Sequence, residues 1–103
     1  MVASGQSCEP KGSLLIFKQI YFSGNTQGVG FRYNAFKLSQ KYGITGSIQN
    51  LPDGRVFLKA EGKEEAIAHF LQELKLKMKN FIMATEETVT PIPERKHTQF
   101  VIL

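Results

Sequence analysis

An apolar run and a helical pattern are joined by the stretch Gly24-Asn25-Thr26-Gln27-Gly28-Val29-Gly30-Phe31-Arg32. Its three glycines allow backbone turns that other residues rarely adopt, so successive N–H groups can converge on one point. The helix expected to begin near Gly30 adds its unpaired N-terminal N–H groups and the positive end of its dipole. The stretch therefore predicts a loop that binds a phosphate group.

Arg32 occupies a position where a cation is usually disfavoured, the first turn of the expected helix. Its charge meets the positive end of the dipole there, at a cost of about 0.3 to 1 kcal/mol when exposed, and a bound dianion would reverse the sign. An arginine taken at random is usually a solvated surface residue. Beside the glycine loop, however, a planar guanidinium can hold two phosphoryl oxygens at once, which a lysine cannot do. We therefore expect Arg32 to bind and stabilise a phosphoryl group.

The spacing of apolar residues predicts elements in the order β-α-β-β-α-β, followed by a short extra C-terminal strand. Turn residues at 51–54 join the second and third strands into a hairpin. This order predicts a ferredoxin-like sandwich of the broad α/β (α+β) class, in which two helices cover one face of an antiparallel sheet. The expected strands lie at 14–22, 44–50, 55–60, 81–90 and 98–103, and the expected helices at 30–42 and 63–79.

The chain has 103 residues, which fits one domain, expected at 14–103 after a flexible N-terminal tail at 1–13. Thirteen Lys and Arg against nine Asp and Glu give a net charge of +4, which favours anionic partners without choosing between a phosphorylated metabolite and RNA. The lone Cys8 excludes an internal disulfide and is consistent with a reducing compartment. Because no apolar run is long enough for a signal peptide or a membrane span, we expect a cytoplasmic protein without a membrane partner.

The glycine-rich stretch resembles the signature of the acylphosphatase family, Gly-x-Val-Gln-Gly-Val-Gly-Phe-Arg, with Thr26 in place of the first valine. Further along, Gly46-Ser47-Ile48-Gln49-Asn50 resembles the family's Gly-Trp-Val-x-Asn, with serine in place of tryptophan. Asp53-Gly54-Arg55-Val56 resembles its Asp-Gly-x-Val turn. The resemblance spans residues 20–62, and the two departures leave Arg32 and Asn50 in place.

The resemblance implies the ferredoxin-like fold and a hydrolase acting on acid anhydrides, which converts acyl phosphates to a carboxylate and inorganic phosphate. It makes Arg32 and Asn50 the catalytic residues, with Asn50 positioning a water for in-line attack on a phosphate that Arg32 holds. By its residue type alone Asn50 is a common turn residue, although its amide has the donor and the acceptor needed to align a water. The implied phosphate-binding residues are Gly24, Asn25, Thr26, Gln27, Gly28, Val29, Gly30, Phe31 and Arg32.

The resemblance also implies that neither a metal ion nor a cofactor takes part. His69 and His97 have no partner at metal-ligand spacing, which agrees with that expectation. The expected ligands are small-molecule acyl phosphates, for example acetyl phosphate, carbamoyl phosphate or 1,3-bisphosphoglycerate, together with inorganic phosphate as product and competitive ligand. We expect the protein to be a monomer.

Two other functions are compatible with the sequence. The same fold with a basic surface describes RNA-recognition domains, and Tyr21 and Phe57 are candidate stacking residues. Residues 27–34 match the aromatic box of those domains poorly, and they open a helix where the box requires a strand, so nucleic acid is not the expected partner. The second alternative is a non-catalytic module that binds phosphorylated ligands within a larger assembly.

Overall fold

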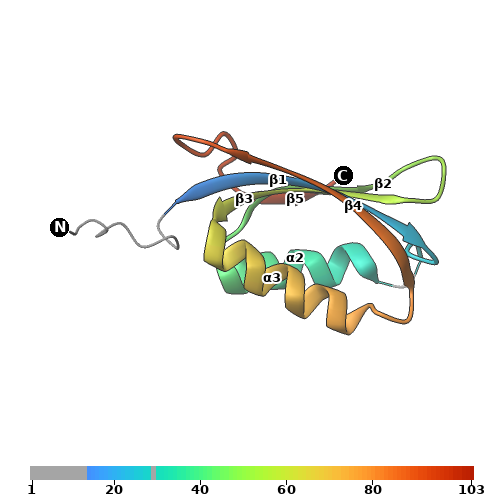
Figure 1. The fold of residues 1–103 in the computed structure, drawn as a ribbon. Helices are drawn as coiled ribbons and strands as arrows, with labels where there is room; N and C mark the ends of the chain where they lie inside the picture. The colour runs from blue at the N-terminus through green and yellow to red at the C-terminus, as the bar shows by residue number, and fades with distance from the viewer. Residues whose placement is uncertain (1–13, 29) are drawn as a thin grey trace.

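Two helices cover one face of a five-stranded sheet in the computed structural model (Figure 1). The structure describes residues 14–28 and 30–103, so the expected tail at 1–13 and the loop residue Val29 lie outside the described residues. The elements are β1 (Leu15–Gly24), α2 (Phe31–Tyr42), β2 (Thr45–Asn50), β3 (Val56–Lys63), α3 (Glu64–Lys77), β4 (Ile82–Pro91) and β5 (Phe100–Ile102).

Every expected element is present, and the predicted fold class is confirmed. The element ends differ from the expectation by a few residues. The alternation of apolar residues predicts that the third strand ends at residue 60. In the structure β3 continues to Lys63, because it pairs with β1 along this whole length. Pairing with a neighbouring strand, which local alternation does not report, sets the end of that strand.

The sheet has the strand order β4-β1-β3-β2-β5. The first four strands pair antiparallel, as predicted, whereas β5 runs parallel to β2 and makes the complete sheet mixed. The parallel direction follows from the path of the chain. After β4 the chain leaves one edge of the sheet, crosses above it and reaches the opposite edge, where the final strand runs in the direction of β2 (Figure 1).

Both helices turn an apolar stripe toward the sheet, and these stripes form the core with alternate residues of the inner strands. Each large apolar side chain that is fully buried contributes roughly 1.5 to 3 kcal/mol. Phe31, the first residue of α2, packs against Phe22 of β1 with ring centroids 4.9 Å apart, so the core anchors the end of the helix that follows the glycine-rich loop. The other buried members include Ala35, Leu38, Ile67, Phe70, Leu71, Leu74, Ile20, Ile48, Val56 and Leu58.

The face of the sheet away from the helices carries an aromatic pair. Tyr21 and Phe57 are cross-strand partners, and their rings stack with centroids 4.4 Å apart. The guanidinium of Arg55 lies 4.5 Å from the centroid of Tyr21, and Nζ of Lys59 lies 5.5 Å from that of Phe57. The two rings therefore pack mainly against each other and against these cations.

A buried carboxylate holds the connection between β4 and β5. Glu61 of β3 is 1% exposed, and its oxygens accept hydrogen bonds from the backbone N–H groups of Lys96, at 3.1 Å, and His97, at 2.9 Å. The Nδ1 of His97 also lies 3.0 Å from Oε2 of Glu61. Arg95 adds hydrogen bonds to the carbonyls of Gly43 and Glu61, at 3.0 and 3.2 Å. These contacts determine where the chain crosses the sheet.

The pKa of Glu61 reflects two opposing effects. Burial raises the pKa. The contact with His97 and the backbone N–H donors of His97 and Lys96 together lower it by more than burial raises it, so the pKa lies below the ordinary value of 4.5. A carboxyl group whose pKa is depressed in the folded state stabilises the fold fully above its unfolded pKa. This contribution is lost as the pH falls through the folded pKa.

We predict that Glu61→Gln lowers the free energy of unfolding by about 1 to 3 kcal/mol at pH 7, because a charged acceptor of backbone hydrogen bonds is lost. The difference from the wild type should shrink as the pH falls below about 4, where the wild-type carboxylate also becomes protonated. Urea unfolding across this pH range measures both effects. Glu94→Gln is the matched control, since Glu94 is an exposed carboxylate of the same connection. A difference that does not change with pH would mean that the charge of Glu61 does not hold the connection.

Candidate active site

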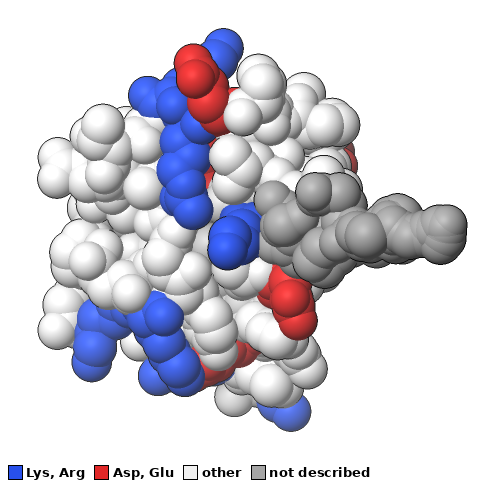
Figure 2. All heavy atoms as spheres, turned by 90° about the vertical axis from the view of Figure 1, so that its left-hand side faces the viewer, with Lys and Arg blue, Asp and Glu red and all other residues white. Residues whose placement is uncertain are grey.

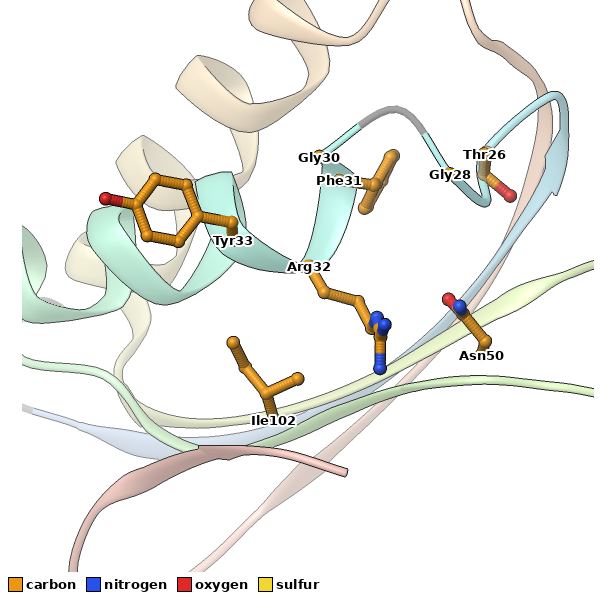
Figure 3. A pocket seen from close by; sticks show the side chains of 8 residues that line it. All are labelled: Thr26, Gly28, Gly30, Phe31, Arg32, Tyr33, Asn50 and Ile102. Carbon is orange, nitrogen blue, oxygen red and sulfur yellow. The ribbon is translucent and has the colours of Figure 1, made fainter.

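A small cavity of about 200 Å³ lies where the β1–α2 loop, the start of α2, the end of β2 and the end of β5 meet (Figure 3). Its volume suits a phosphoryl group with a short substituent and is below the range typical of larger ligands. The residues that line it are Thr26, Gly28, Gly30, Phe31, Arg32, Tyr33, Asn50 and Ile102.

The N-terminus of α2 is open toward this cavity. Gly30 precedes the helix with φ +77°, a left-handed conformation that favours glycine, and caps it without a side-chain hydrogen bond. The first backbone bond of the helix is donated by Asn34 to the carbonyl of Gly30, at 3.0 Å, so the N–H groups of residues 31–33 have no partner within the helix. The first turn contains no acidic residue, whereas α3 begins with Glu64 and Glu65. The positive end of α2 is thus left available for an anion.

Arg32 directs its guanidinium into the cavity, toward Asn50 (Figure 3). Its Nη1 donates to the backbone carbonyl oxygen of Leu103 at 2.9 Å, which holds the end of the side chain beside β5. Within residues 14–28 and 30–103, no carboxylate side chain forms a salt bridge with Arg32, whereas Arg55 pairs with Asp53 at 2.8 Å. No described Asp or Glu side chain therefore occupies the remaining donors of Arg32, which can bind an anion.

Asn50, the last residue of β2, brings a polar side chain to the opposite wall of the cavity (Figure 3). Its Oδ1 is buried and has no hydrogen-bond partner among the described residues. Buried polar atoms almost always have a partner, and leaving one without costs about 1 to 3 kcal/mol. The position of Asn50 therefore fits an acceptor for a donor that enters the cavity, such as a water.

The loop is tied to the β2–β3 hairpin by side chains. Nε2 of Gln27 donates to the carbonyls of Leu51, at 2.8 Å, and Arg55, at 3.0 Å. The hydroxyl of Thr26, which is 1% exposed, donates a longer hydrogen bond of 3.4 Å to the carbonyl of Gly54. These hydrogen bonds keep the glycine-rich loop next to the strand that ends in Asn50.

The structure brings most of the predicted site residues together. Thr26, Gly28, Gly30, Phe31, Arg32 and Asn50 all line the cavity, whereas Val29 lies outside the described residues. Gly24, Asn25 and Gln27 were predicted to bind phosphate, but they are not among the lining residues.

For two of these three residues the structure provides another reason for the residue type. A Cβ atom on Gly24 would lie 2.5 Å from the carbonyl oxygen of Phe81 and 2.8 Å from the backbone nitrogen of Met83, so glycine permits the close approach of β4. The side chain of Gln27 is engaged with the hairpin.

Two lining residues were not predicted from the sequence. Tyr33 follows Arg32 in the first turn of α2, so the predicted start of the helix could have placed it near the cavity. Ile102 could not be found in this way, because only the parallel pairing of β5 with β2, in which Ile102 is opposite Ile48, brings it to the cavity.

Among residues 14–28 and 30–103, no group of three or more His, Cys, Asp or Glu side chains is arranged to hold a metal ion. No helix in the described part of the chain combines the length and the apolar character that a membrane crossing requires.

The family model for acylphosphatase matches residues 18–102, which include the loop, both helices and Asn50. The chain belongs to the acylphosphatase family. The acylphosphatase of Archaeoglobus fulgidus is 48% identical over 61 residues, which cover 59% of this chain and 68% of that protein. That of Ligilactobacillus salivarius is 33% identical over 86 residues, covering 84% of this chain and 94% of the relative.

A solved structure supports the same conclusion. The crystal structure of acylphosphatase from Bacillus subtilis has a TM-score of 0.68 and 32% sequence identity to this chain, covering 85% of it and 98% of the Bacillus chain. The family contains hydrolases that act on acid anhydrides. The predicted family, fold class and enzyme class are therefore confirmed, and the family's substrates are acyl phosphates.

We predict that Gln27→Ala weakens the binding of inorganic phosphate by up to about thirtyfold, because two hydrogen bonds worth about 1 kcal/mol each no longer hold the loop. Titration calorimetry with inorganic phosphate measures this effect, and circular dichroism reports whether the fold is retained. Gln72→Ala on the exposed face of α3 is the matched control and should bind phosphate as the wild type does. Unchanged affinity in a folded Gln27→Ala protein would show that the loop keeps its position without this side chain.

Proposed function

We propose that the chain hydrolyses acyl phosphates by in-line attack of a water that Asn50 positions on a phosphoryl group held by Arg32 and the backbone of residues 24–31. One observation carries the proposal. The guanidinium of Arg32 and the Oδ1 of Asn50 line the same small cavity at the N-terminus of α2; within the described part of the chain, Arg32 has no Asp or Glu partner and Oδ1 has no hydrogen-bond partner.

The phosphoryl group is the part of the substrate that this cavity suits best. The guanidinium offers planar N–H donors for two phosphoryl oxygens, and the N–H groups at the start of α2 offer further donors. The negative charge of the phosphoryl group offsets the unfavourable position of Arg32 near the positive end of the helix. These donors are fixed by the fold, so they need little rearrangement as charge shifts during the reaction.

The reaction itself requires little more than positioning. The water oxygen forms a bond to phosphorus while the bond from phosphorus to the acyl oxygen breaks, and the bonding pair leaves with the carboxylate. The water transfers a proton to a phosphoryl oxygen of the substrate, so the products are a carboxylate and inorganic phosphate. None of the described residues lining the cavity is Asp, Glu or His, which supports this route without a protein base.

The role of Asn50 in this scheme is to align the nucleophile. Its Oδ1 accepts a hydrogen bond from the water and turns one lone pair of the water oxygen toward phosphorus. A carboxylate is a good leaving group, so alignment together with electrostatic stabilisation of the phosphoryl oxygens accounts for most of the acceleration.

The proposal also covers the oligomeric state, the ligands and the cellular location of the protein. We further propose a monomer that acts on small, diffusible acyl phosphates, with inorganic phosphate as a competitive ligand. Turnover should not need a metal ion, and the cytoplasmic location expected from the sequence belongs to this proposal. Size-exclusion chromatography tests the monomer.

Nucleic-acid binding has weaker support. Tyr21 and Phe57 stack on each other and lie next to Arg55 and Lys59, so the rings are already engaged and less available for bases. On the end of the molecule seen in Figure 2, Lys and Arg lie in separate groups with acidic side chains among them. Such a distribution is less suited to following a phosphodiester backbone than a continuous basic stripe would be.

The proposed reaction is tested by hydrolysis of benzoyl phosphate in the presence of EDTA. The wild type should turn over, Arg32→Ala should be inactive, and Arg32→Lys should lose about 100-fold or more in kcat/KM, because it keeps the charge but loses the planar pair of donors. Lys79→Ala, at an exposed cation after α3, should retain full activity. Near-normal turnover by Arg32→Lys would remove the argument for bidentate binding, and an inactive folded wild type would remove the function.

Asn50→Ala should lower kcat about 100-fold, because the water is no longer aligned, while the inhibition constant of inorganic phosphate stays as in the wild type. Steady-state kinetics with phosphate as inhibitor separates the two effects. Asn80→Ala serves as the control at an exposed asparagine. If Asn50→Ala instead loses phosphate binding, its side chain holds the phosphoryl group and the assigned role is wrong.

A further inference from the structure

The two sides of the cavity differ in chemical character. In-line displacement places the attacking and leaving oxygens on opposite sides of phosphorus. Asn50 lies on one side of the Arg32 guanidinium, and Ile102 and Tyr33 lie on the other (Figure 3). With a water held by Asn50, the acyl group of the substrate therefore extends toward Ile102 and Tyr33.

We propose that Tyr33 and Ile102 form an acyl-binding subsite, and that it selects acyl phosphates with an apolar, preferably flat aromatic, acyl group. This inference rests on the proposed function, because the side of the cavity on which the acyl group lies follows from the role of Asn50. It assigns two specificity-determining residues to the site.

The exposure of these side chains supports a binding role. Ile102 is 43% exposed and Tyr33 is 60% exposed, although the core beside them buries Phe31 and Phe100 almost completely. Ile102 projects from the helix-facing side of β5 toward the first turn of α2, between Arg32 and Tyr33 (Figure 3). Two large side chains with accessible apolar surface thus line the cavity on the side away from Asn50 (Figure 3).

The position of the Tyr33 ring is supported from its own helix. Nζ of Lys37, one turn further along α2, lies 5.5 Å from the ring centroid, within cation–π distance. In this position the ring extends along α2, away from Arg32 (Figure 3).

The size of the cavity indicates which acyl groups gain most from the subsite. About 200 Å³ accommodates the phosphoryl group and the carbonyl, so a larger acyl group must extend over the rim formed by Tyr33 and Ile102. An acetyl group ends before it makes much contact there, whereas a benzoyl ring covers apolar surface of both side chains. Tyr33 and Ile102 are themselves uncharged, so the surface that they offer suits an apolar acyl group.

The experiment compares kcat/KM for benzoyl phosphate and acetyl phosphate in the wild type, Tyr33→Ala, Ile102→Ala and the double variant. The benzoyl-to-acetyl ratio should fall about tenfold in the double variant, as expected for the loss of roughly 50 Å² of apolar contact, and most of the change should appear in KM for benzoyl phosphate. The inhibition constant of inorganic phosphate should not change, because phosphate does not reach the subsite. Tyr33→Phe should keep the wild-type ratio.

Leu76→Ala is the matched control, since Leu76 is an apolar side chain on α3 that is 64% exposed and does not line this cavity. An unchanged ratio in the double variant, with phosphate inhibition retained, would overturn the acyl subsite and leave the proposed function standing. A wild type that hydrolyses neither substrate would overturn both proposals. A parallel loss of activity on both substrates together with loss of phosphate inhibition would mean that Ile102 or Tyr33 supports Arg32, and this too would overturn the subsite.

Discussion

The two hydrogen bonds from the side-chain amide of Gln27 to the carbonyls of Leu51 and Arg55 are the constraint on which the site depends. The glycine-rich loop and Asn50 lie on separate segments of the chain, and β3 separates their strands in the sheet. A glycine-rich loop has many accessible conformations, so its N–H groups converge on one point only if something outside the loop holds it. The amide of Gln27 does so at the turn that follows Asn50.

A second constraint acts from the other end of the sheet. Glu61 fixes the chain where it crosses toward β5, and this crossing brings β5 alongside β2. The same strand delivers Ile102 to the cavity and the carbonyl of Leu103 to the guanidinium of Arg32. A buried carboxylate that does not line the cavity therefore contributes to the geometry of Arg32, and a change of stability at Glu61 should be accompanied by a change at the proposed site.

The two departures from the family motifs have different surroundings. Thr26 lines the cavity, but its hydroxyl donates to the carbonyl of Gly54, so the added polar group supports the tie between loop and hairpin. Ser47 is 7% exposed and is paired with Lys59 on β3 and Val101 on β5, away from the residues lining the cavity. Neither substitution removes a donor or an acceptor that the proposed reaction uses. The residues to which the proposed reaction assigns a role, Arg32, Asn50 and the backbone of the loop, are therefore unaffected by the two departures.

The sequence by itself determined the strand and helix order, the helix that starts after Gly30, the central position of Arg32 and the family, because these depend on local periodicity and short motifs. Only the tertiary structure decided that Gln27 turns to the hairpin, that β5 joins β2 in parallel and that Ile102 completes the cavity. Each of these depends on contacts between residues far apart in the chain, such as Ile48 with Ile102. Local sequence patterns do not predict such pairings, because the packing of the whole sheet determines which strands pair at its edges and where their side chains point.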